Sequence, residues 1–198
     1  MKKLKYFSVL LLALVVLAGC KNDNAAKSND FYDKTFNWKI TIPGDYEVLD
    51  QNEVNKSKTD GKDLLTNKNS APTETTKDIL VFKKDDANYF SANYEEYTGS
   101  EQFVDLRLKL KDFLILKNIG QIYPKGKMDD YSVSKENISG LEFRKAKIVL
   151  TEEGKTIATA VVFSRFFNGK IFVAAIVYED ELYGKAMIDL FKQSTFKK

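Results

Sequence analysis

Hydrophobic and polar residues alternate most regularly in the last third of the chain. Four stretches predict consecutive antiparallel strands over Tyr131–Glu136, Leu141–Thr151, Thr156–Phe167 and Lys170–Tyr178. Residues 152–155 make one turn between them, and Asn168-Gly169 makes another, which is the strongest short hairpin signal because both residues tolerate positive φ. Every residue of Ile171–Val177 is apolar, so this strand should be central in a sheet with helices covering both faces.

The first half of the chain predicts three more strands. Phe36–Ile42 alternates with period two and ends at a Pro-Gly turn. Ile79–Lys83 and Tyr89–Tyr97 form a pair joined across a short polar loop. Residues 50–78 contain few apolar side chains, and we expect a weak surface helix over roughly 50–66 followed by a loop.

The segment after Tyr97 fits both a strand and a helix. Four residues alternate as in a strand, namely Val104, Leu106, Leu108 and Leu110. One helical face would hold Phe103, Leu106, Leu110, Phe113, Leu114 and Lys117, widened by Val104, Leu108, Ile115 and Ile119. Length, a capping box at Thr98-Gly99-Ser100-Glu101 and Gly120 as a stop favour the helix. A last helix is predicted over about 180–194, with Phe196 packed behind it.

These elements predict an α+β fold in one domain over residues 35–198. We expect a single antiparallel sheet of about six strands flanked by helices, in an α/β/α sandwich.

The start of the chain has the layout of a secretory signal. Three lysines at positions 2, 3 and 5 precede an apolar run over residues 6–19, which is short for a membrane span. The residues Leu17-Ala18-Gly19-Cys20 resemble the lipobox of bacterial lipoproteins. The resemblance implies that residues 1–19 are a signal peptide, that Cys20 carries lipid, and that residues 20–34 tether the domain to a membrane.

The expected location is therefore the cell envelope, on a periplasmic or surface face. Lys21 stands where many lipoproteins that stay in the inner membrane have Asp, which favours the outer membrane. Two or three acyl chains anchor a protein stably, whereas one binds only marginally.

Composition excludes several classes of function. Removing the three lysines of the signal lowers the formal charge from +3 to 0, so nucleic acid is not an expected partner. The chain has no histidine and its only cysteine is Cys20, which excludes serine–histidine triads, cysteine nucleophiles, histidine-bound zinc and disulfides. The acid pairs Asp85-Asp86, Asp129-Asp130 and Glu152-Glu153 are typical of solvated turns. We predict no catalytic, metal-binding or cofactor-binding residues.

Three features together resemble the PsbP-like fold, which includes a photosystem II subunit and bacterial DcrB-like lipoproteins. They are the opening strand Phe36–Pro43, the hairpin from Phe163 to Tyr178, and a last helix ending in the aromatic tail at Phe196. The resemblance covers most of residues 35–198. It implies a non-enzymatic module that binds another macromolecule, and the family offers no catalytic residues to carry over.

Three functions follow from these features. The first is a lipid-anchored, non-catalytic protein that binds a protein partner as scaffold or chaperone. The second is a carrier of a small apolar ligand, and the third, less favoured, is a hydrolase that uses carboxylates. The aromatic residues Tyr89, Phe90, Tyr94 and Tyr97 should be core residues, with a partner-binding face as the alternative.

Overall fold

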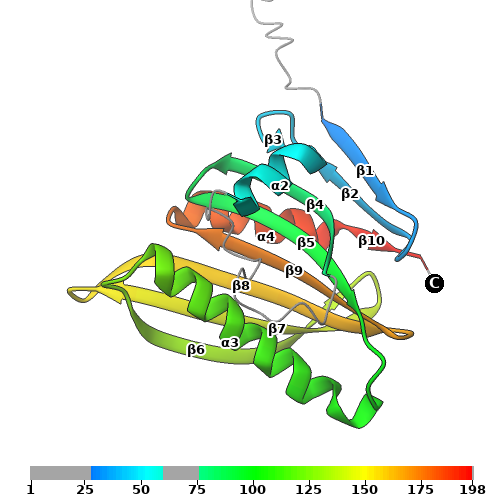
Figure 1. The fold of residues 1–198 in the computed structure, drawn as a ribbon. Coiled ribbons are helices and arrows are strands. Elements are labelled where there is room, and N and C mark those ends of the chain that lie inside the picture. The colour runs from blue at the N-terminus through cyan, green and yellow to red at the C-terminus, as the bar shows by residue number, and fades with distance from the viewer. Residues whose placement is uncertain (1–27, 60–75, 198) are drawn as a thin grey trace, which may run out of the picture.

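The structure is a computed structural model that describes residues 28–59 and 76–197 (Figure 1). The strands are β1 (Asn29–Asp33), β2 (Trp38–Ile42), β3 (Glu47–Val48), β4 (Lys77–Asp85), β5 (Asn88–Glu96), β6 (Lys127–Ile138), β7 (Leu141–Glu152), β8 (Lys155–Phe167), β9 (Lys170–Tyr178) and β10 (Thr195–Phe196). The helices are α2 (Gln51–Thr59), the 3₁₀ turn η2 (Glu101–Phe103), α3 (Val104–Ile122) and α4 (Glu181–Gln193).

A seven-stranded antiparallel sheet forms the centre of the molecule, in the order β3-β4-β5-β9-β8-β7-β6. The predicted strand pair 79–83 and 89–97 and the four-strand meander are confirmed. The all-apolar segment Ile171–Val177 lies in β9, between β5 and β8, and both of its faces are buried. Its even-numbered residues from Phe172 to Ile176 join one apolar cluster, and the odd-numbered residues join another.

Two-residue turns set the register of the meander. Asn168 and Gly169 have φ of 42° and 82°, and Glu153 and Gly154 have φ of 51° and 76°. Positive φ at both central residues gives the turn a twist that matches the strands it joins, which is why Asn-Gly predicted the hairpin correctly.

The prediction of one sheet with about six strands is wrong in the number of sheets and strands. β2 does not join the large sheet but pairs with β1 and β10 in a separate three-stranded sheet. β10 comes from the end of the chain, and the backbone amide of Lys197 donates to the carbonyl of Asn37. Pairing between segments so far apart in sequence leaves no signal in the local pattern.

The small sheet and α4 cover one face of the large sheet, and α3 covers the other (Figure 1). One face is therefore covered by a helix and a small sheet, where the sequence predicted helices alone. Trp38 is fully buried there, stacked on Phe196 and edge-on to Phe172. Its indole nitrogen donates a hydrogen bond of 2.9 Å to the hydroxyl of Ser194, which links β2 to the end of α4.

The predicted long helix is present, but the expected signals for its ends are wrong. η2 precedes it, and neither Ser100 nor Phe103 makes a side-chain capping bond. Gly120 lies inside α3, which continues to Ile122. The last helix is α4, whose first turn is capped by Asp180 accepting from the amide of Leu182.

The predicted tether and surface helix are only partly described. β1 occupies Asn29–Asp33, so the expectation of a tether through residue 34 is wrong over these residues, which pair with β2. α2 covers the start of the predicted helix, and residues 60–66 lie outside the described residues. The predicted signal peptide 1–19 and the predicted lipidation site Cys20 lie outside them as well.

Candidate functional site

Helix α3 lies against the large sheet through a narrow apolar face. Leu108, Ile115 and Ile119 are buried on this inner face and pack against apolar residues of β7, β8 and β9. Charged side chains border the inner face on both sides. The helix is therefore held by a mixture of apolar packing and buried ion pairs.

The first charged cluster lies between α3 and β5. Glu95 of β5 is only 2% exposed and accepts hydrogen bonds of 3.0 and 3.2 Å from the guanidinium of Arg107. The ammonium of Lys111 lies 2.7 Å from Oε2 of the same carboxylate, an oxygen that also accepts from Arg107. Burial lowers the pKa of Lys111, although the charge of Glu95 opposes that shift.

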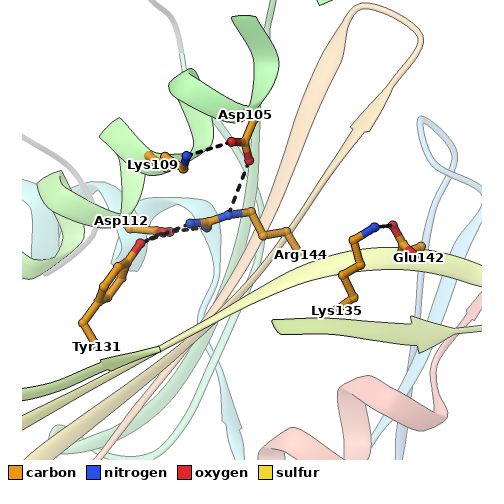
Figure 2. A network of polar contacts seen from close by, with 7 residues as sticks. All are labelled: Asp105, Lys109, Asp112, Tyr131, Lys135, Glu142 and Arg144. Carbon is orange, nitrogen blue, oxygen red and sulfur yellow. Dashed lines mark hydrogen bonds and ion pairs between the residues drawn. The ribbon is translucent and has the colours of Figure 1, made fainter. Parts of the chain in front are cut away.

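The second charged cluster lies between α3 and strands β6 and β7 (Figure 2). Asp112 is buried, forms an ion pair with Arg144 of β7, and accepts a hydrogen bond of 2.9 Å from the hydroxyl of Tyr131. Asp105 lies 4.0 Å from Arg144 and 3.0 Å from Lys109. Burial raises the pKa of Asp112, against the opposite effect of Arg144.

These two clusters fix the rotation of α3 about its axis. Rolling the helix would separate Glu95 from two cations and Asp112 from Arg144. A buried charge that loses its partner costs about 3–5 kcal/mol. Ion pairs on both sides of the inner face therefore determine which face of α3 contacts the sheet.

The outer face of α3 carries four large apolar side chains, Phe103, Leu106, Leu110 and Phe113, of which Phe103 immediately precedes the helix. We call them the apolar seam. Their exposed fractions are 53%, 66%, 46% and 61% respectively. The spacing of three, four and three residues places them in one line along the helix, opposite Leu108 and Ile115. Exposed apolar side chains gathered in one line make this face a candidate interaction surface.

The sequence pattern grouped the seam correctly on one helical face but did not indicate that this face points outward. Leu108, Ile115 and Ile119, which the sequence pattern added at the edge of the predicted face, are the residues that are buried. The alternative aromatic binding face is wrong, because Phe90 is fully buried and Tyr89, Tyr94 and Tyr97 pack against the two apolar clusters. The exposed phenylalanines are instead Phe103 and Phe113 of the seam.

The adjacent acids do not gather into a site. Within residues 28–59 and 76–197, no group of three or more metal-binding side chains could hold an ion. Glu179 accepts a hydrogen bond of 2.5 Å from the hydroxyl of Tyr123, and Asp180 caps α4. Among the described helices, none is long and apolar enough to span a membrane.

Comparisons with known proteins establish the fold and nothing finer. No protein-family model matches the sequence, and neither does any curated protein. The fold is similar to the solution structure of cyanobacterial PsbP (CyanoP) from Synechocystis sp. PCC 6803, with a TM-score of 0.51 and 11% identity. The match covers 92% of this chain and 99% of that one. The predicted PsbP-like α+β fold is confirmed.

Proposed function

We propose that this chain is a lipid-anchored protein of the cell envelope whose non-catalytic domain binds a protein partner, as scaffold or chaperone, through the apolar seam. The observation that carries the proposal is the outward position of Leu106 and Phe113, held there by buried ion pairs on both sides of α3. A helix that buries charges and exposes Leu106, Leu110 and Phe113 has a surface suited to a second macromolecule.

The position of the anchor favours a protein over the bilayer as the occupant of the seam. The described domain begins next to β1, which belongs to the layer on the far side of the large sheet from α3 (Figure 1). Residues 20–29 span at most about 30 Å when fully extended. The lipid on Cys20 would therefore lie within that distance of β1, which leaves the seam free to face a neighbouring protein beside the domain instead of the bilayer.

The seam fits a protein better than a small apolar ligand. Small-molecule sites are concave, whereas the seam is the outer side of a helix. The layer between α3 and the sheet contains Glu95 and Asp112 with their cations, and an apolar cargo there would have to lie against buried charge.

A matched pair of variants tests the binding surface. Leu106→Glu places a charge in the seam, and Leu182→Glu places the same charge at a 72% exposed leucine of α4, on the other side of the large sheet. Pull-down from detergent-solubilised envelopes should recover a partner with wild type and Leu182→Glu but not with Leu106→Glu. Equal recovery with both variants would refute the seam as the binding surface.

The anchor has a separate test. Mass spectrometry of the mature amino terminus should show acylated Cys20, and Cys20→Ser should give an uncleaved or released protein. Fractionation should place the wild-type chain with the outer membrane. An unmodified Cys20 thiol would refute the anchor.

A further inference from the structure

We infer that the occupant of the apolar seam is a second copy of this chain, docked through its own seam with the two α3 helices antiparallel. The inference rests on the proposed function, since it names the partner of the same surface. Its basis is the order of the side chains. Phe, Leu, Leu and Phe at positions 103, 106, 110 and 113 read the same in both directions, and so does their spacing.

This symmetry matches the requirement of a two-fold interface, in which one patch must complement itself. In the antiparallel pair, Phe103 lies opposite Phe113 of the second copy, and Leu106 lies opposite Leu110 of the second copy. Each large ring meets a ring at the ends, and leucines meet at the centre. The spacing of three and four residues is that of side-by-side helix packing.

Charges beside the seam distinguish antiparallel from parallel docking. Asp105 and Lys109 lie on the same flank of the seam, 3.0 Å apart. In the antiparallel pair, Lys109 of each copy lies about 3 Å along the helix axis from Asp105 of the other copy, which is the rise of two residues. In parallel docking the two-fold axis runs along the helices, so the charged flanks of the two copies lie on opposite sides of the seam and do not meet. The flank therefore complements itself only in the antiparallel arrangement.

The size of the seam implies that pairing depends on the membrane. Four side chains are far fewer than the 20–30 residues that each partner contributes to a standard stable interface. Two copies anchored in one membrane are confined together, and their pairing is then governed by an effective concentration higher than the bulk one. Free domains in dilute solution pair weakly for the same reason.

Two exposed lysines of α3 test the geometry. Lys109 and Lys117 are both solvent-exposed. The only cysteine of the wild-type chain is Cys20, so the wild-type chain gives the cross-linking background for a cysteine introduced at either site. In the antiparallel pair, the two copies of position 109 lie about 3 Å apart along the helix axis, whereas the two copies of position 117 lie about 27 Å apart.

The experiment uses the full-length chain in its own membrane with a short bismaleimide. Lys109→Cys should give a covalent dimer at least several-fold above the wild-type background, and Lys117→Cys should stay at background. Absence of the Lys109→Cys dimer, or equal dimer from both variants, would overturn the inference. Absence of the Lys109→Cys dimer would mean that the chain does not pair with itself. Equal dimer from both variants would mean parallel docking or random collision.

Adding the seam variants separates this inference from the proposed function. Leu106→Glu should reduce the Lys109→Cys dimer to background, and Leu182→Glu should leave it unchanged. If Leu106→Glu instead removes a different protein from the pull-down while Lys109→Cys never gives a dimer, the seam binds that protein and self-pairing is refuted. If Leu106→Glu affects neither measurement, the seam itself is refuted.

Discussion

Glu95 and Lys111 lie 2.7 Å apart between β5 and α3, with the Glu95 side chain only 2% exposed. Arg107 binds the same carboxylate, so one acid is shared by two cations of the helix. The net contribution of this ion pair to stability is small, because desolvation offsets much of the attraction between buried charges. Its clearer effect is directional, since it allows only one face of α3 to contact the sheet.

Removal of the Glu95 carboxylate should be costly. Glu95→Ala leaves Arg107 and Lys111 without their buried counter-charge, so we expect a loss of about 3–5 kcal/mol in the free energy of unfolding. Asp189→Ala breaks the exposed Lys185–Asp189 pair of α4 and should cost less than about 1 kcal/mol. Urea denaturation of the two variants measures both values, and equal losses would contradict the directional role of Glu95.

Asp112 should make stability depend on pH with a defined sign. Its pKa in the folded protein is raised above the ordinary 3.8, so the folded state holds this proton more tightly than the unfolded chain. The stability that protonated Asp112 contributes is present at low pH and is lost as pH rises through the folded pKa. Asp112→Asn removes the titration. The free energy of unfolding of wild type minus that of the variant should therefore fall as pH rises from about 4, and a rise would show a lowered pKa instead.

Two helix glycines should respond to alanine in opposite directions. A Cβ at Gly184 would lie 2.4 Å from the ring of Tyr178, because α4 packs closely on β9. Gly184→Ala should therefore cost about 1–3 kcal/mol through overpacking. A Cβ at Gly120 of α3 meets nothing within 4 Å, so Gly120→Ala should gain about 0.5–1 kcal/mol from helix propensity. Thermal denaturation measures both, and a stabilising Gly184→Ala would show that α4 can move away from β9.

Ser194 should be coupled to Trp38. Ser194→Ala leaves the buried indole N–H without its acceptor, which should cost about 1–3 kcal/mol. In Trp38→Phe the donor is already gone, so adding Ser194→Ala should cost less than it does in wild type. A double-mutant cycle by denaturation gives the coupling energy. Strict additivity would mean that the 2.9 Å bond contributes nothing.

Several parts of the fold were predictable because their signals are local. Asn168-Gly169 fixed a hairpin through backbone conformations that few residues adopt, and Ile171–Val177 indicated a central strand because both of its faces are apolar. The capping box was also a local signal, but its prediction of the helix start was wrong. The spacing of Thr98 and Glu101 was correct, but η2 starts the helix differently and no side-chain cap forms.

The sequence by itself determined the meander, the two main helices and the inventory that leaves Cys20 as the only thiol in a chain without histidine. Only the tertiary structure decided how the strands divide between two sheets and which side of α3 faces outward. The helix is apolar around much of its circumference, so periodicity alone could not choose between Leu106 and Leu108. Glu95 and Arg144 made that choice, and they come from strands whose distance to α3 is set by the folded sheet.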